Sequence, residues 1–122
     1  MKKISKNEIT AVILAGGQAS RMDGEDKGLI VFRELPLISH VINITKPKVS
    51  QILISANRNF EEYANFGKVI SDDLEGYQGP LAGISKALKV CSTPYLLVLP
   101  CDSPLIDAAL IDSLIEKMEI SN

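Results

Sequence analysis

The sequence predicts one α/β domain with an open, mostly parallel β-sheet and helices on both faces. Short apolar runs, rich in Ile, Val and Leu, alternate along the chain with stretches of helical spacing. The runs cover residues 9–14, 51–56, 68–70 and 95–99, with a weaker run at 29–32. Strands that are buried on both faces of a parallel sheet have this nearly continuous apolar character.

The stretches between the runs place apolar residues at helical spacing. The predicted helices cover residues 37–45, 81–90 and 110–118, and Asp107 is the expected N-cap of the last one. Strands that alternate with short helices form βαβ units, which build an open sheet of the Rossmann-like kind. Because ligands bind outside the carboxyl ends of such strands, we expect the residues directly after each run to carry the chemistry.

The composition is that of a soluble globular domain. The chain has 122 residues, of which 46% are hydrophobic and 23% charged, and its formal net charge is −2. The weak negative charge argues against a broad contact with nucleic acid or with an anionic membrane. The apolar runs are too short to span a bilayer, which takes about 20 residues. We therefore expect no nucleic-acid or membrane partner.

The remaining single residues point to a cytoplasmic protein without covalent catalysis. Cys91 and Cys101 lack the spacing of a zinc site and are expected to be reduced thiols. No secretory signal pattern follows the basic N-terminus. His40 lies in a predicted helix without a second ligand nearby, so we expect a structural role for it. No strand follows the last helix, so we expect the sheet to be truncated on its C-terminal side and the chain to be part of a larger fold.

The loop after the first run combines a glycine pair with two cations. Gly16 and Gly17 allow a sharp turn that directs backbone N–H groups toward an anion. Arg21 and Lys27 add a guanidinium fork and a point charge for phosphate oxygens. The Walker-A and Rossmann glycine patterns are both absent, which disfavours P-loop enzymes and dehydrogenases. A simple turn with surface charges remains the alternative to a phosphate site.

A carboxylate follows the last apolar run. Asp102 lies between Pro100 and Pro104, where the end of a buried parallel strand would direct it into a cleft. One carboxylate, together with phosphate oxygens and water, is a usual arrangement for Mg²⁺. The alternative is that Asp102 only caps the turn before the last helix.

A third segment suits recognition of a purine base. Asp72 begins an acidic pair, and Gly79 and Pro80 form a turn that opens a helix at Leu81. A carboxylate or backbone carbonyls can accept hydrogen bonds from the N–H edge of guanine, and glycines let the backbone approach a base closely. An ordinary solvated loop is the alternative.

Taken in order, these motifs resemble those of molybdenum cofactor guanylyltransferases of the MobA type. The motifs are Leu-Ala-Gly-Gly at 14–17, Arg-Met at 21–22, Asp-Lys-Gly at 26–28, Gly-Pro-Leu-Ala-Gly at 79–83 and Pro-Cys-Asp-Ser-Pro at 100–104. The resemblance implies a Mg²⁺-dependent enzyme that transfers GMP from GTP to molybdenum-molybdopterin and releases pyrophosphate. It also implies a molybdopterin-type acceptor and proteins that deliver the cofactor as partners. Residues 1–122 would then be the nucleotide-binding part of the nucleotidyltransferase domain.

The resemblance also implies residue roles. Lys27, Arg21 and Asp102 would be catalytic, with Asp102 as the metal ligand. The implied nucleotide contacts are Leu14, Ala15, Gly16, Gly17, Lys27, Ser55, Asn57, Asp72, Gly79, Pro80, Leu81 and Asp102. Ser55 stands where the family often has Asn, and Asp23 where it usually has Gly. Two alternatives stay open: a cytidylyl or sugar-phosphate nucleotidyltransferase of the same fold, or a non-catalytic nucleotide-binding or docking module.

Overall fold

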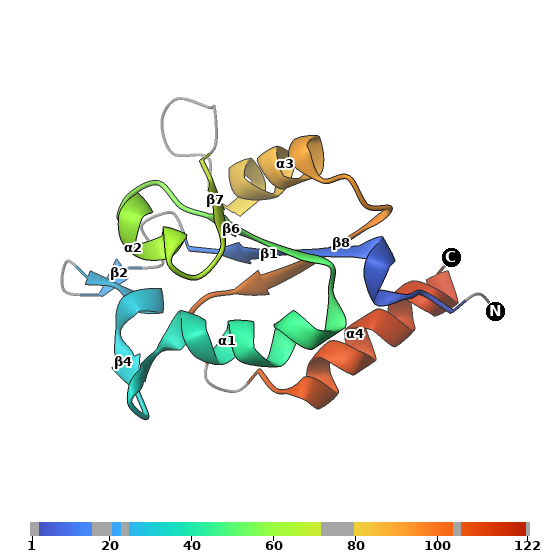
Figure 1. Ribbon diagram of the computed structural model, residues 1–122, viewed down its shortest axis with the longest axis horizontal. Helices are drawn as coiled ribbons and strands as arrows, with labels where there is room; N and C mark the ends of the chain where they lie inside the picture. The colour runs from blue at the N-terminus through green and yellow to red at the C-terminus, as the bar shows by residue number, and fades with distance from the viewer. Residues whose placement is uncertain (1–2, 16–20, 23–24, 72–79, 104–105, 122) are drawn as a thin grey trace.

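Among the residues that the structure describes, the main sheet has four parallel strands in the order β7-β6-β1-β8 (Figure 1). The computed structural model describes residues 3–15, 21–22, 25–71, 80–103 and 106–121. The strands of the main sheet are β1 (Ile9–Leu14), β6 (Gln51–Ser55), β7 (Lys68–Ile70) and β8 (Tyr95–Pro100). The helices are α1 (Leu37–Thr45), α2 (Phe60–Ala64), α3 (Pro80–Val90) and α4 (Ala108–Ser121).

Short elements connect these parts. Two small antiparallel hairpins pair β2 (Arg21–Met22) with β3 (Glu25–Asp26), and β4 (Val31–Phe32) with β5 (Leu35–Pro36). Among the described residues, the 3₁₀ turns are η1 (Lys6–Glu8), η3 (Lys27–Leu29) and η4 (Lys46–Lys48). The β2–β3 hairpin and η3 lie between β1 and α1 in the chain, so this excursion precedes the first helix that packs on the sheet.

The path of the chain through the sheet reverses beside β1. From β1 it moves outward to β6 and β7, and it then returns to β8 on the other side of β1. Leu14 at the end of β1 is in register with Ser55 of β6 and with Pro100 of β8. The carboxyl ends of β1 and β8 therefore form a topological switch point, the place where ligands bind in open α/β sheets.

Helices cover both faces of the sheet, as predicted. Ala11 and Ile13 of β1 belong to the larger apolar core, which also holds buried residues of α1, α2 and α4. Val12 belongs to a second core with Ala87 of α3. Successive side chains of a strand point to opposite faces. The two cores therefore lie on the two sides of one sheet, with α1 and α4 on one side and α3 on the other (Figure 1).

Most predicted elements have the expected positions. The bounds of β1, β7 and α1 agree with the prediction, whereas β6 is one residue shorter and β8 and α3 each one residue longer. The helix predicted at 110–118 is longer at both ends, and Asp107 caps it, because the Leu110 N–H donates to Asp107 Oδ1 at 2.9 Å. The five-residue helix α2 was not predicted, because it is too short to display a helical period.

The weak strand prediction at 29–32 is wrong for the main sheet. Residues 27–29 form η3, and only Val31 and Phe32 form a strand, in the hairpin with β5. Arg33 and Glu34 between these strands both have positive φ, of 52° and 72°. A two-residue connection of this kind closes a tight hairpin. The apolar run therefore turns back on itself at the surface instead of joining the parallel strands.

Three further findings concern single residues and the membrane. His40 Nε2 is hydrogen-bonded to the Phe32 carbonyl, and its ring packs edge-on against the Phe32 ring, which is a structural contact. Cys91 and Cys101 are free thiols. Within the part of the chain that the structure describes, no helix combines the length and the apolar character needed to cross a bilayer.

Candidate functional site

A lysine and an aspartate meet at the switch point. Asp102 follows Pro100, the last residue of β8, by two positions, and Lys27 is the first residue of η3. Lys27 Nζ lies 3.8 Å from Asp102 Oδ2, and the two side chains are 35% and 29% exposed. Two of the three residues predicted to be catalytic therefore lie side by side, at the edge where the β1 and β8 strands end, and both remain accessible to a ligand.

Arg21, the third residue predicted to be catalytic, lies in the same segment between β1 and α1 as Lys27. Arg21 pairs through its backbone with Asp26 in the β2–β3 hairpin, next to Lys27 in sequence. The role of its guanidinium group stays a prediction. The predicted contacts of Gly16, Gly17, Asp72 and Gly79 lie outside the described residues.

The other residues predicted to contact a nucleotide differ in accessibility. Leu14 is half-buried, and Asn57 is exposed just beyond β6. Ala15 is buried, and its N–H already donates to the Ser55 carbonyl at 2.8 Å. A nucleotide contact by Ala15 would therefore have to use other atoms. Pro80 is the first residue of α3, and the neighbouring Leu81 is 74% exposed.

Ser55 is covered by the first turns of α3. Its side chain is buried, with 5% of the residue exposed. A Cβ built on Gly83 would lie 2.4 Å from Ser55 Oγ and 3.3 Å from Leu14 Cδ2. Gly83 therefore lets the helix approach the ends of β1 and β6. The last glycine of the 79–83 motif serves the packing of helix on strand, a role that sequence reasoning did not assign to it.

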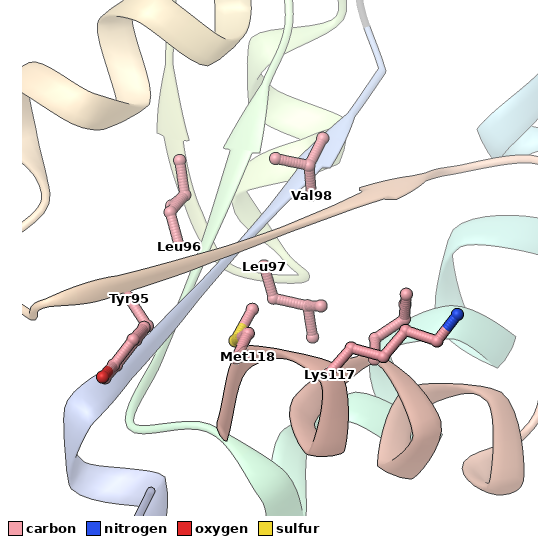
Figure 2. Close-up of a pocket in the computed structure, with 7 residues that line it drawn as sticks. Tyr95, Leu96, Leu97, Val98, Lys117 and Met118 are labelled. Atoms are coloured by element: carbon pink, nitrogen blue, oxygen red, sulfur yellow. The ribbon is translucent and has the colours of Figure 1, made fainter. Parts of the chain in front are cut away.

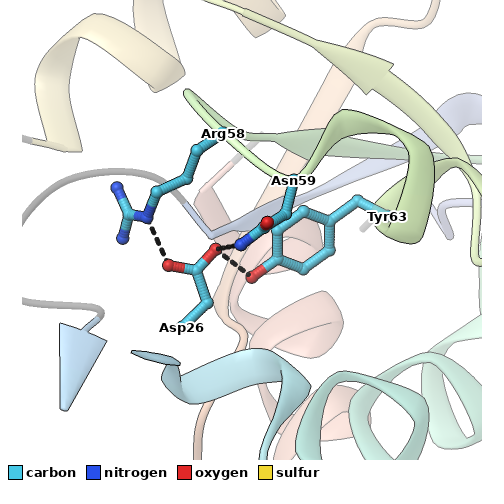
Figure 3. Close-up of polar contacts among 4 residues, drawn as sticks. All are labelled: Asp26, Arg58, Asn59 and Tyr63. Carbon is cyan, nitrogen blue, oxygen red and sulfur yellow. Dashed lines mark hydrogen bonds and ion pairs between the residues drawn. The ribbon is translucent and has the colours of Figure 1, made fainter. Parts of the chain in front are cut away.

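Sequence reasoning also missed a polar cluster that holds Asp26. Asp26 is 2% exposed, and its Oδ1 accepts a hydrogen bond from Arg58 Nε. Its Oδ2 accepts hydrogen bonds from Asn59 Nδ2 at 2.9 Å and from the Tyr63 hydroxyl at 3.1 Å (Figure 3). No local spacing links position 26 to positions 58–63, so only the fold shows that they meet.

Gly28 completes the packing of this segment against β8. A Cβ on Gly28 would lie 3.0 Å from Cys101 Sγ and 3.3 Å from the Tyr63 hydroxyl oxygen. Because Gly28 lacks a side chain, η3 can rest directly on Cys101, the residue before Asp102. The Asp-Lys-Gly motif thus consists of a buried anchor, a partly exposed cation and a close-approach glycine.

Two buried acids beside the site stay protonated. Burial, with a contribution from the Asp102 charge, raises the pKa of Cys101 to about 12. Burial and the charge of Asp26 likewise raise the pKa of Tyr63. The Cys101 thiol is therefore a packing group rather than a nucleophile, because thiolates carry the nucleophilic chemistry of cysteine. The Tyr63 hydroxyl keeps the proton that it donates to Asp26.

An apolar pocket of about 480 Å³ lies away from these residues, between β8 and α4 (Figure 2). Its lining residues are Tyr95, Leu96, Leu97, Val98, Leu114, Lys117 and Met118. Among the described residues that line it, Lys117 and the Tyr95 phenol are the ionisable groups, and none is predicted to bind the nucleotide. The polar groups at the strand ends, rather than this pocket, therefore form the candidate site.

Comparison with known proteins agrees with the motifs. Residues 11–122 match the family model of the MobA-like NTP transferase domain. A molybdenum cofactor guanylyltransferase from Shewanella sediminis is 51% identical over 94% of this chain, and one from Polynucleobacter asymbioticus is 52% identical over 95% of it. The chain spans 59% of the length of each of these relatives.

Solved structures share the fold. A nucleotidyl transferase from Methanothermobacter thermautotroptrophicus superimposes with a TM-score of 0.73 at 17% identity, covering 90% of this chain and 57% of that one. A CMP:2-keto-3-deoxy-manno-octonic acid synthetase in complex with CTP gives a TM-score of 0.72 at 22% identity, covering 93% and 48%. These likenesses concern the fold, whereas the family match extends over residues 11–122. The chain belongs to the MobA-like NTP transferase family.

Proposed function

We propose that this chain is the GTP-binding part of a molybdenum cofactor guanylyltransferase, which transfers GMP from GTP to molybdenum-molybdopterin. The observation that carries the proposal is the Lys27–Asp102 pair, 3.8 Å apart at the switch point between β1 and β8. The guanylyltransferases that are 51% and 52% identical support the choice of substrate. Because the chain spans 59% of their length, the acceptor and the delivery proteins belong to the proposal as well.

The proposed reaction places little covalent chemistry on the protein. An oxygen of the terminal phosphate of the acceptor forms a bond to the α-phosphorus of GTP, while the bond from that phosphorus to the bridging oxygen breaks and pyrophosphate leaves. Lys27 and Arg21 stabilise the negative charge that moves onto the leaving group, and the backbone N–H groups of Gly16 and Gly17 hold phosphate oxygens. Positioning and charge neutralisation supply the rate, as in other phosphoryl transfers.

The donor set at the strand ends fits Mg²⁺. Asp102 offers one partly exposed carboxylate, and Mg²⁺ commonly takes one or two carboxylates together with substrate phosphates and water. Among the described residues, no three His, Cys, Asp or Glu side chains cluster as an all-protein metal site. The chemistry that Mg²⁺ supplies when bound beside Asp102 is neutralisation of charge on phosphate oxygens.

The remaining nucleotide contacts are assigned to three segments. Leu14 and Ala15 would contact the nucleotide at the end of β1, and Ser55 and Asn57 at the end of β6. The proposed contacts with the guanine end are Asp72, which follows β7 in the sequence, and Gly79, Pro80 and Leu81, where α3 begins. The exposed Leu81 side chain supports an apolar contact with a base. We place the protein in the cytoplasm, where its cysteines remain thiols.

A nucleotide screen tests the proposal. We expect GTP with Mg²⁺ to raise the unfolding temperature of the chain more than ATP, CTP or UTP with Mg²⁺ does. A ligand at about 100 times its Kd stabilises a protein by about 2.7 kcal/mol. A preference for CTP would transfer the proposal to the cytidylyl class. A chain that responds to none of the four would be a docking module instead.

Substitution of the Lys27–Asp102 pair tests the site. Lys27→Ala and Asp102→Asn should each weaken GTP binding by about tenfold or more, because each removes a charge-assisted contact. Lys48→Ala and Asp112→Asn are matched controls, since this lysine and aspartate pair at 2.7 Å between η4 and α4, away from the strand ends. Equal effects of the two pairs would contradict the assignment.

Turnover tests the complete function. A chimera can join this chain to the part of the Shewanella sediminis relative with which it does not align. In that chimera, Lys27→Ala should reduce GMP transfer by about a hundredfold, judged by other groups that stabilise transition-state charge. Pyrophosphate release measures the rate, and full activity of the variant would contradict the catalytic role.

A further inference from the structure

Asp26 is a charged residue in a place where charge is costly. Its side chain is fully buried, and Arg58, Asn59 and Tyr63 donate hydrogen bonds to its two oxygens (Figure 3). A buried carboxylate is tolerated when it is paired and hydrogen-bonded in this way. The contacts are also directional, so they fix the position of the backbone at residue 26 and not only its charge.

All three donors come from the connection that follows β6. Arg58 and Asn59 lie between β6 and α2, and Tyr63 lies in α2 with its ring fully buried. Asn59 adopts a left-handed conformation with φ of 54°, which asparagine tolerates better than most residues. Three side chains of this connection therefore converge on one carboxylate of a segment that is distant in the sequence.

The adjacent residue is the proposed phosphate-binding lysine. The side chain of Lys27 reaches to within 3.8 Å of Asp102 at the end of β8. The side chain of Asp26, the preceding residue, is instead held by the connection between β6 and α2. A lysine side chain has many rotamers, so the position of its ammonium group depends on how firmly the backbone of the residue is fixed. Gly28 then packs on Cys101, so the cation is held on both of its flanks.

We propose that Asp26 is a positioning residue, which acts through its contacts with Arg58, Asn59 and Tyr63 to hold Lys27 beside Asp102 for the triphosphate. This proposal rests on the proposed function, because it assigns the role of Lys27 to nucleotide binding. It extends that function to a cluster that is not among the proposed nucleotide contacts. A purely structural role of the cluster would change stability without acting through Lys27.

The test is a double-mutant cycle on GTP affinity. Asp26→Asn removes the buried charge, and Tyr63→Phe removes one hydrogen bond but leaves every charge in place. Each should weaken GTP binding by about tenfold in the otherwise unchanged chain, and by less than twofold when Lys27→Ala is also present. Tyr95→Phe makes the same chemical change at the start of β8, at the other end of the sheet, and should leave affinity unchanged.

Tyr63→Phe keeps the cycle informative even if Asp26→Asn does not fold. An equal loss of affinity in the presence and absence of Lys27→Ala would overturn the proposal, because the cluster would then not act through Lys27. Unchanged affinity in Tyr63→Phe and Asp26→Asn would overturn it as well.

A second readout needs no nucleotide and so separates this proposal from the proposed function. The NMR chemical shifts of ¹³C-methyl groups attached to the lysines report the surroundings of each ammonium group. The Asp102→Asn variant shows how much of the Lys27 chemical shift is due to the neighbouring Asp102 carboxylate. Asp26→Asn and Tyr63→Phe should move the Lys27 resonance toward its position in Asp102→Asn, whereas Tyr95→Phe should not. A chain that binds no GTP but shows these shifts would refute the function and retain the positioning role. An unmoved resonance would refute the positioning role alone.

Discussion

Three adjacent residues at the candidate site differ entirely in their surroundings. Asp26 is buried among three hydrogen-bond donors, Lys27 is partly exposed beside Asp102, and Gly28 lies against Cys101. Because adjacent side chains leave the backbone in different directions, one short segment can be anchored on one element and deliver a charge to another. The order of the residue types in the motif follows from this placement.

Gly28→Ala tests the close approach at the residue scale. The new Cβ would lie 3.0 Å from Cys101 Sγ and 3.2 Å from Cys101 Cβ. Cys101 is itself held in the packed core, so it cannot easily move away. We expect a loss of about 1–3 kcal/mol in the free energy of unfolding, as for other overpacked sites. Urea denaturation measures it, and the added variant Cys101→Ala should recover part of the loss.

Gly67→Ala is the matched control for this prediction. Its new Cβ would meet the Ile52 carbonyl oxygen and Ile54 Cδ1 at 3.4 Å, which is ordinary contact. The free energy of unfolding should change by less than about 0.5 kcal/mol, the usual range for substitutions without a specific mechanism. If Gly28→Ala were no more costly than Gly67→Ala, the packing argument for the motif would fail.

At this scale the sequence predicts charges better than contacts. Lys27 and Asp102 could be expected to meet, because both belong to segments at the carboxyl ends of parallel strands. The partners of Asp26 could not be predicted, because they lie 32 to 37 positions away and no period connects them. The burial of Ser55 beneath Gly83 depends in the same way on how closely a helix approaches a strand.

The strands of the main sheet could be predicted because each is a short run made mostly of apolar residues. β1 and α1 have their predicted bounds, because β1 is a continuous buried apolar run and α1 shows helical spacing over nine residues. β7 also has its predicted bounds, although its first residue, Lys68, is exposed. The weaker run at 29–32 is followed by Arg33 and Glu34, whose positive φ values turn the chain back, and a pattern of hydrophobicity does not reveal such a turn. α2 has five residues and is held by Tyr63 in the core rather than by an amphipathic stripe.

Gly83→Ala tests the packing of α3 on the sheet at the element scale. Alanine favours a helix over glycine by about 1 kcal/mol, so propensity alone predicts a more stable protein. The new Cβ would, however, lie 2.4 Å from Ser55 Oγ, in a buried contact. We expect the clash to prevail, with a net loss of about 1–3 kcal/mol in the free energy of unfolding.

The Ser55→Ala variant provides the control, because it removes the oxygen that the new methyl group meets. The double variant should then be more stable than the sum of the two single changes predicts. Urea denaturation of the four proteins gives the coupling. Strict additivity would mean that α3 moves away from β6 at little cost, and that Gly83 is not needed for this contact.

On the scale of the whole molecule, the sheet divides the core into two unequal parts. The larger part lies beneath α1 and α4 and includes Tyr63 and Cys101, while the smaller part lies beneath α3. Cys101 precedes Asp102 in the chain, and the Tyr63 hydroxyl donates to Asp26, the residue before Lys27. The residues that support the candidate site are therefore also residues on which the stability of the domain depends.

This placement predicts how stability depends on pH. Burial raises the pKa of Cys101 to about 12, whereas a thiol of the unfolded chain titrates near 9. Between these values the unfolded chain releases a proton that the folded chain keeps, so the Cys101 contribution is complete below pH 9 and is lost as pH rises toward 12. For one such group the free energy of unfolding falls by about 1.4 kcal/mol per pH unit.

Cys101→Ala should therefore flatten the decline of stability between pH 9 and pH 11, measured by urea denaturation at constant ionic strength. Cys91→Ala is the matched control. Although partial burial raises the pKa of Cys91, hydrogen bonds with Thr93 and Thr10 outweigh this effect and bring it below the ordinary thiol value. Its contribution therefore has the opposite sign, and removing it should not flatten the curve. Equal slopes for the two variants would show that Cys101 titrates in the folded protein as it does in the unfolded chain.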